Sequence, residues 1–143
     1  MTKQLVNLVK IAKQKLDMQE KALLRNQMAI KRKRSEIDSI NAQIATIPMP
    51  TSGSFSAYQS QKDSIRAYIY QIEEIQIQIG NLYKEQEHIT QQIRIAHLEH
   101  EKMLYLYNKA KDAEMTEQNK KEAKRLDEAT IMLHSRHANI ATS

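Results

Sequence analysis

The five histidines are the residues whose side chains could bind a metal ion or move a proton near neutral pH. In a helix, His97, His100 and Glu101 would share one face, and so would His134 and His137. No further ligand lies at a fitting position to complete either group, as a zinc site would need. We therefore interpret these histidines as solvated helix residues, and we expect no metal site and no cofactor.

Other catalytic chemistry has even less support in the sequence. The chain contains no cysteine, which excludes disulfides, zinc-thiolate sites and thiol nucleophiles. It also contains no glycine-rich phosphate loop, no nucleophile elbow and no HExxH motif. The elements described below form two layers of helix, which offer no cavity that could exclude water. We predict that the protein is not an enzyme.

The basic run at residues 30–34 offers a different chemistry, electrostatic binding. Residues 1–34 hold ten Lys/Arg and two acidic residues, a net charge of +8, whereas residues 35–143 carry a net charge of −3. Such a run is either a solvated face or a site of attachment to an acidic protein groove or a nucleic acid. The run has no interleaved aromatic residues, so a protein partner is favoured over nucleic acid.

The composition predicts long helices as the elements that carry these residues. Of 143 residues only two are Gly and two are Pro, and three of those four lie at Pro48, Pro50 and Gly53. Aromatic content is 5% and charged content 27%, which is typical of extended helices rather than of a compact core. No stretch approaches 18 apolar residues, so no membrane span is expected. Lys10, Lys13 and Lys15 interrupt any apolar stretch of the kind found in signal peptides.

The positions of these Pro and Gly residues, which interrupt helices, predict an all-α fold of one domain, residues 1–143. The predicted fold is a long two-helix antiparallel coiled-coil hairpin. We expect a helix over residues 3–47, a loop over 48–55, a second helix over 56–138 and a tail over 139–143. Ser54 or Ser56 is a suitable N-cap for the second helix. A short connection makes the two helices antiparallel neighbours.

A heptad repeat predicts which residues form the seam between the helices. In the first helix it places Leu5, Val9, Ala12, Leu16, Gln19, Leu23, Asn26, Ile30, Lys33, Ile37, Ile40, Ile44 and Ile47 in the seam. In the second it runs from Ile65 to Ala110 and breaks at about residues 112–122. The frame that follows contains Ala123, Leu126, Thr130 and Leu133.

Aligning the two seams predicts a register. We expect Ile40 opposite Ile65, and Leu5 opposite His100. The same register sets Gln19 opposite Gln86, which would form one matched amide layer. Residues from about 101 to 138 then extend beyond the first helix without a partner. A lone amphipathic helix is marginal in water, so this overhang either binds a partner, folds back, forms a third helix or dimerises.

A row of apolar residues also lies outside the predicted seam of the second helix. Counted from Ile72 at position a, these residues occupy position f, which is farthest from the first helix. The predicted exposed apolar stripe consists of Tyr70, Ile77, Leu98 and Tyr105. Such a row usually marks a contact surface, and a four-helix dimer would bury it as well as a different partner would.

Two segments resemble a known family. Residues 56–61, Ser-Ala-Tyr-Gln-Ser-Gln, are similar to the Tyr-Gln beginning of the second helix in the FliJ/YscO stalk proteins of flagellar export and type III secretion. Residues 120–129, Lys-Lys-Glu-Ala-Lys-Arg-Leu-Asp-Glu-Ala, resemble that family's C-terminal pattern of a Lys/Arg-rich turn before Leu-Asp-Glu. The resemblance covers nearly the whole chain.

The resemblance implies a cytoplasmic protein at the inner-membrane export apparatus. Its partners would be the hexameric export ATPase, the export-gate membrane protein and export chaperones, and it would act like the stalk of a rotary ATPase. By alignment of the Tyr-Gln pair, the residues expected to bind the export gate are Tyr58, Gln61, Ile65, Tyr68 and Ile72. The family's gate row is surface-exposed, whereas three of these residues belong to the predicted seam, so the register and the alignment disagree there.

The cationic residues are the ones that we expect to contact the ATPase. They are Lys10, Lys13, Lys21, Arg25, Lys31, Arg32, Lys124 and Arg125. Two other functions remain open on the sequence. One is a structural coiled coil that self-associates through the exposed apolar stripe, and the less favoured one is a basic helical protein that binds nucleic acid.

Overall fold

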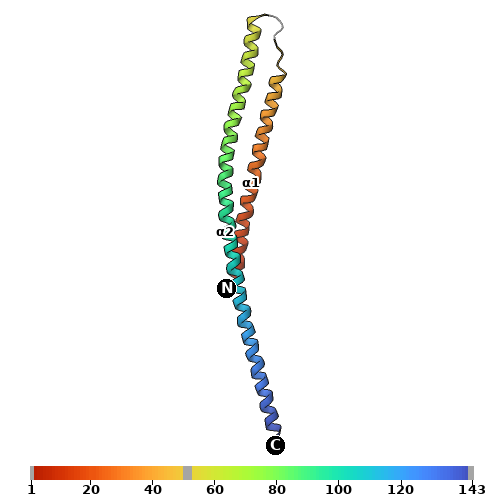
Figure 1. Cartoon of the computed structure of the whole chain (residues 1–143), viewed down its shortest axis with the longest axis vertical. Helices are drawn as coiled ribbons and strands as arrows, with labels where there is room; N and C mark the ends of the chain where they lie inside the picture. The colour runs from red at the N-terminus through yellow and green to blue at the C-terminus, as the bar shows by residue number, and fades with distance from the viewer. Residues whose placement is uncertain (1, 50–52, 142–143) are drawn as a thin grey trace. The chain divides into compact units, whose positions relative to one another are not determined.

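Two long helices make up the computed structural model, which describes residues 2–49 and 53–141. Helix α1 spans Thr2–Ala45 and helix α2 spans Phe55–Ala141. Segments of the two helices pack side by side and run in opposite directions (Figure 1). No strand occurs within these two ranges. The predicted all-α helical hairpin is therefore confirmed.

The connection between the helices starts earlier than the sequence predicts. The last turn of α1 tightens, since the amides of Thr46 and Ile47 donate to the carbonyls of Gln43 and Ile44 at 3.1 and 3.2 Å. Pro48 follows and has no amide hydrogen with which to continue the helix. The predicted loop residues 50–52 lie outside the described part of the chain.

Helix α2 begins at Phe55 and continues past the predicted end at residue 138. The Ser54 carbonyl accepts the first helical bond from the Tyr58 amide at 3.3 Å, which places Ser54 at the N-cap, one of the two predicted caps. The helix reaches Ala141, so part of the predicted tail is helical. Residues 142–143 lie outside the described ranges.

The predicted seam is where the side chains are buried. All predicted seam positions from Leu5 to Ile47, and those of α2 from Ile65 to Ala110, are buried or half-buried. The most buried residues are Ala12, Leu16, Asn26, Ile30, Ile40 and Ile89. The heptad pattern therefore identifies the face of each helix that packs.

The chain divides into two compact units. Unit 1 comprises Met1–Lys13 and Leu98–Ser143, and unit 2 comprises Gln14–His97. Each unit contains a segment of both helices, with α1 packed on α2. The two units are described separately below.

The register predicted for unit 2 is wrong by about one heptad. Ile40 lines one cleft together with Gln71 and Ile75, whereas the prediction set it opposite Ile65. The Arg34 guanidinium donates to the Tyr83 hydroxyl and lies 5.6 Å from the centre of its ring. In the predicted register these two residues would be about 18 Å apart along the helix axis, so they could not meet.

Unit 1 requires the same correction. The prediction sets Leu5 opposite His100, which would put Thr2 near Met103. Instead the Thr2 hydroxyl donates to the Glu114 carboxylate at 3.4 Å. Tyr107 and Ala110 are half-buried rather than part of an overhang. Half-buried side chains of α2 therefore continue to Ala110, so the overhang begins at about residue 111, not 101.

The correction also removes the predicted amide layer of Gln19 and Gln86. A shift of about one heptad moves Gln86 to the level of Asn26. Asn26 is 4% exposed, and its Nδ2 donates to the Leu82 carbonyl at 2.9 Å. A heptad repeat packs equally well in registers one heptad apart, so the pattern alone could not choose between them. The observed register buries more apolar surface at this end, because it half-buries Tyr107 and Ala110.

Candidate protein-binding surfaces

The end of α2 in unit 1 has no buried side chain among the residues that the structure describes. Every side chain from Lys111 to Ala138 is exposed. Thr116 and Thr130 each donate to the carbonyl four residues earlier, at 2.9 Å, so their hydroxyls are satisfied within the helix. Lys121 lies 4.0 Å from Glu117 in an exposed pair. We call residues 111–138 the terminal helix segment.

Large apolar side chains occur on this terminal helix segment. Leu126 and Leu133, from the predicted second frame, are 67% and 59% exposed. Met115, Ile131 and Met132 are exposed as well. Apolar residues at helical spacing with nothing packed on them are typical of a contact surface. Lys124 and Arg125, two of the cations expected to bind the ATPase, lie exposed beside them.

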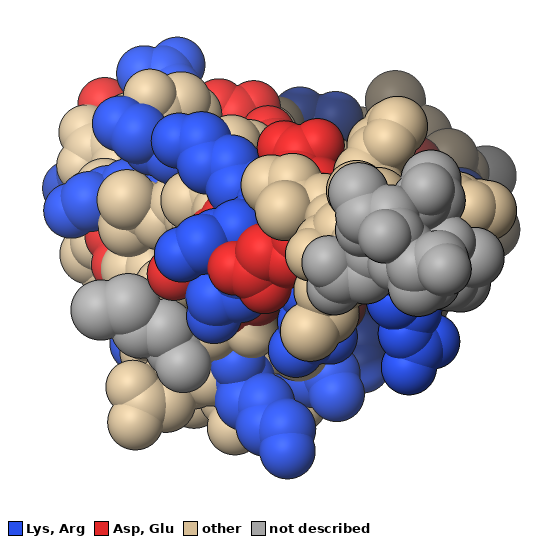
Figure 2. Space-filling view, turned by 90° about the horizontal axis from the view of Figure 1, so that it is seen from below, with Lys and Arg blue, Asp and Glu red and all other residues tan. Residues whose placement is uncertain are grey.

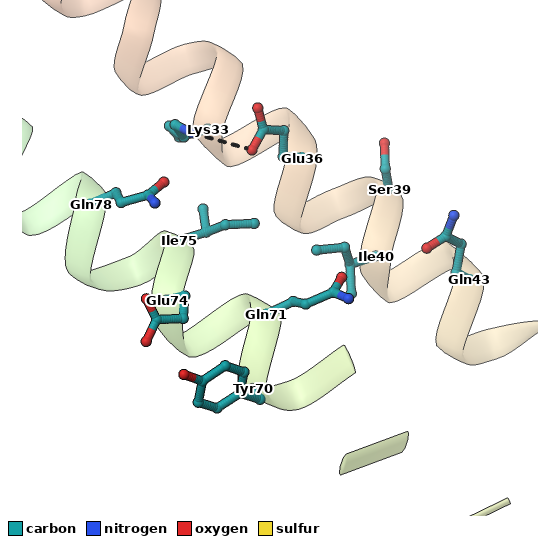
Figure 3. A pocket seen from close by; sticks show the side chains of 10 residues that line it. All are labelled: Lys33, Glu36, Ser39, Ile40, Gln43, Tyr70, Gln71, Glu74, Ile75 and Gln78. Atoms are coloured by element: carbon teal, nitrogen blue, oxygen red, sulfur yellow. Dashed lines mark ion pairs between the residues drawn. The ribbon is translucent and has the colours of Figure 1, made fainter. Parts of the chain in front are cut away.

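A cleft of about 510 Å³ opens between the helices of unit 2 (Figure 3). Ile75 points toward α1, and the side chains of Ile40 and Gln71 approach each other from the two helices. Lys33 pairs with Glu36 at 3.6 Å on the rim. Amide and carboxylate side chains form most of the remaining lining. The cleft is open to solvent and has a mixed polar and apolar lining, so it suits a side chain of a partner protein better than a buried small molecule.

The residues that the family alignment assigned to the gate surface lie mostly in the seam. Ile65, Tyr68 and Ile72 are half-buried against α1. Gln61 is also half-buried, and its Nε2 donates to the Pro48 carbonyl at 3.4 Å. Only Tyr58, at 52%, is exposed. For these residues the seam assignment is therefore right, and the transferred row is not a freely exposed surface.

The predicted apolar stripe is exposed in both units. In unit 2, Tyr70 and Ile77 are 63% and 60% exposed, and Tyr70 lies on the side of α2 away from α1 (Figure 3). In unit 1, Leu98 and Tyr105 are similarly exposed, and the Lys109 ammonium lies 5.9 Å from the centre of the Tyr105 ring. Each unit therefore exposes two residues of the predicted stripe on α2.

The cations expected to bind the ATPase are divided between the units. Lys10, Lys13, Lys124 and Arg125 belong to unit 1, and the other four belong to unit 2. All eight are exposed. Figure 2 shows Lys and Arg side chains over much of the displayed face, with Asp and Glu among them.

The outer face of α1 in unit 2 contains apolar residues that the sequence reading did not select. Met18, Leu24 and Met28 are 68%, 57% and 56% exposed. They alternate with four of the cations at spacings of three and four residues. Reading the heptad positions that face away from the seam, rather than those in the seam alone, would have found them.

Metal binding and membrane insertion find no support. Within residues 2–49 and 53–141, no group of three potential ligands could hold a metal ion. Among the helices so described, none combines the length and apolarity that crossing a bilayer requires.

Comparison with known proteins adds the family. Residues 1–139 match the family model described as flagellar FliJ protein. No curated protein and no solved structure matches the chain. Because the family model covers almost all of a chain that folds as the expected helical hairpin, this chain belongs to the FliJ family, whose members are components of the flagellar export apparatus.

Proposed function

We propose that this chain is a non-enzymatic, stalk-like component of the export apparatus that binds the export ATPase ring through unit 1. The observation that supports this most is the terminal helix segment, residues 111–138, whose side chains are all exposed. A single helix is about 10 to 12 Å wide with its side chains, so it can enter the opening of a ring that a helix pair would fill. Its exposed apolar side chains would become buried against the ring on insertion.

Electrostatics support the same end of the chain. Unit 1 presents Lys10 and Lys13 on α1, and Lys124 and Arg125 on α2, all exposed. Cations at exposed positions speed the encounter with an acidic bore and orient it, while apolar contacts supply most of the affinity. We propose that these four residues contact the ATPase.

Deletion of the terminal helix segment tests the proposal. A variant ending at Lys111 retains the seam residues up to Ala110, so it should fold and melt like the full chain, judged by circular dichroism. We expect it to lose stimulation of the export ATPase. A matched full-length variant, Leu126→Ser with Leu133→Ser, should weaken stimulation, and Leu24→Ser, on the other unit, should not. Normal stimulation by the truncated chain would rule the proposal out.

The other partners are proposed from the family resemblance. For the export gate, we propose Tyr58 as the main contact, because it is the one exposed residue of the transferred set. The other four residues of the set are half-buried, so they would position Tyr58 and add contacts through their exposed atoms. They are Gln61, Ile65, Tyr68 and Ile72. Export chaperones are proposed as further partners. With these partners the chain would act in the cytoplasm, at the membrane-embedded apparatus.

Self-association is the second candidate function. It is supported by the exposed pairs Tyr70 with Ile77 and Leu98 with Tyr105. It predicts a stable dimer or tetramer in sedimentation velocity that is lost when Ile77 and Leu98 become Glu. The stalk proposal predicts a monomer, with or without those substitutions.

A further inference from the structure

The outer face of α1 in unit 2 has an unusual composition. Outer positions of a two-stranded coiled coil, b, c and f of the heptad, normally carry a mixture of acidic, basic and amide side chains. Between residues 18 and 32 every such position instead carries a cation or a large apolar residue. These seven residues, which we call the α1 outer face, are Met18, Lys21, Leu24, Arg25, Met28, Lys31 and Arg32.

Outer positions of a different composition border this segment on both sides. The preceding outer positions hold Gln14 and Asp17, and the following ones hold Ser35, Asp38 and Ser39. A face whose only role is solubility normally includes acidic or amide residues within four helical turns, as the flanking outer positions do. This segment has none. The segment therefore has the features of a contact surface.

We propose that the α1 outer face binds an acidic amphipathic helix of another protein. The four cations select a partner of opposite charge. Met18, Leu24 and Met28 all expose more than half of their surface, so a partner could bury apolar area on them. Methionine is flexible and adapts to irregular partner surfaces. The face is about 21 Å long, the length of about four helical turns.

A cleft on the same helix can receive a side chain of the partner. It measures about 420 Å³ and is lined by Met28, Lys31, Arg32, Ser35, Glu36 and Ser39. An apolar side chain of the partner would lie on Met28 while its acidic neighbours reach Lys31 and Arg32. This arrangement is the usual one for an amphipathic helix bound in a groove.

Two other occupants fit the face less well. Insertion into an anionic lipid surface usually relies on Trp, Phe and several Leu residues on one side of a helix, whereas here cations separate one Leu from two Met. A nucleic acid would gain from aromatic side chains on which bases stack, and the face has none. Both are outcomes of the test below.

The proposal goes beyond the stalk function and does not depend on it. The α1 outer face belongs to unit 2, whereas the terminal helix segment belongs to unit 1. The variant of its apolar residues, Leu24→Ser with Met28→Ser, should therefore stimulate the ATPase normally. Failure of either proposal leaves the other standing.

The experiment measures binding of the full chain to three labelled peptide probes by fluorescence anisotropy. The first probe is a designed helix with a leucine stripe flanked by glutamates. The second has Gln in place of each Glu, and the third has Ser in place of each Leu. We expect the first probe to bind most tightly, its affinity to fall with added salt, and both altered probes to bind at least tenfold more weakly.

Variants of the chain locate the binding site. Leu24→Ser with Met28→Ser, and Lys21→Glu with Arg25→Glu, should each weaken binding of the first probe by about tenfold or more. The matched controls on the outside of α2, Ile77→Ser and Lys84→Glu, should leave it unchanged. Since all of these side chains are exposed, circular dichroism should show equal melting temperatures.

Several results would overturn the proposal. One is the absence of binding by the first probe, or binding that the face variants leave unchanged. Another is tighter binding to phosphatidylglycerol vesicles or duplex DNA than to the probe, lost in the same variants. Self-association in sedimentation velocity that these variants abolish would assign the face to a second copy instead.

Discussion

Asn26 is a polar residue in a seam position that normally holds an apolar one. It is 4% exposed, and only its Nδ2 is satisfied, by the Leu82 carbonyl at 2.9 Å. Its Oδ1 is buried without a hydrogen-bond partner in the part of the chain that the structure describes. An unsatisfied buried acceptor costs about 1–3 kcal/mol. Polar seam residues nevertheless persist in coiled coils because they disfavour alternative registers.

Replacing Asn26 with leucine should therefore stabilise the hairpin. We expect the free energy of unfolding of Asn26→Leu to rise by about 1–2 kcal/mol, because the substitution removes the unsatisfied oxygen and adds apolar contact. Urea unfolding followed by circular dichroism measures the change. The matched control is the exposed neighbour Gln27, whose replacement by leucine should change stability by less than about 0.5 kcal/mol. A loss of stability in Asn26→Leu would show that the bond to Leu82 outweighs the unsatisfied oxygen.

For individual residues, the sequence predicted correctly which side chains are buried, but it did not predict which residues of the two helices meet. The heptad pattern identified Asn26 as a seam residue and Tyr70 as an outer one, because both assignments depend only on helix periodicity. It did not predict that Arg34 meets Tyr83, since that contact depends on the register. The resemblance transferred Ile65 and Tyr68 to an exposed row, yet the structure half-buries both.

At the scale of the elements, the register is the feature that sequence periodicity cannot fix. Two heptad repeats can slide by one heptad and still place every seam residue in the seam. What distinguishes the registers is how much of each helix end is covered. The observed one covers Tyr107 and Ala110 and leaves the terminal helix segment to begin at about residue 111.

Engineered disulfides can test this register, since the chain has no cysteine of its own. The pair Ile40→Cys with Ile72→Cys should oxidise readily, because Ile72 lies between Gln71 and Ile75, which line the cleft with Ile40. The matched pair Ile40→Cys with Ile65→Cys, drawn from the predicted register, should remain reduced within the monomer. Thiol titration and peptide mapping distinguish the two. Efficient bonding of the second pair, and not the first, would restore the predicted register.

At the scale of the whole molecule, packing is unevenly distributed along α2. Buried and half-buried positions recur along residues 57–110, whereas all side chains from Lys111 to Ala138 are exposed. Helices gain most of their stability from tertiary packing, so the two stretches should differ greatly in local stability. Low local stability is typical of segments that become ordered on binding a partner.

Hydrogen exchange should show this difference directly. In the isolated chain we expect amides of residues 115–138 to be protected by about tenfold or less, since all side chains of that stretch are exposed. Amides near Leu16, Ile40 and Ile89 should be protected by several orders of magnitude more, because their side chains are buried. Addition of the export ATPase should slow exchange in residues 115–138 if that segment enters the ring. Strong protection there without any partner, together with a dimer in sedimentation velocity, would mean that a second copy covers the segment, and self-association would then replace the stalk proposal.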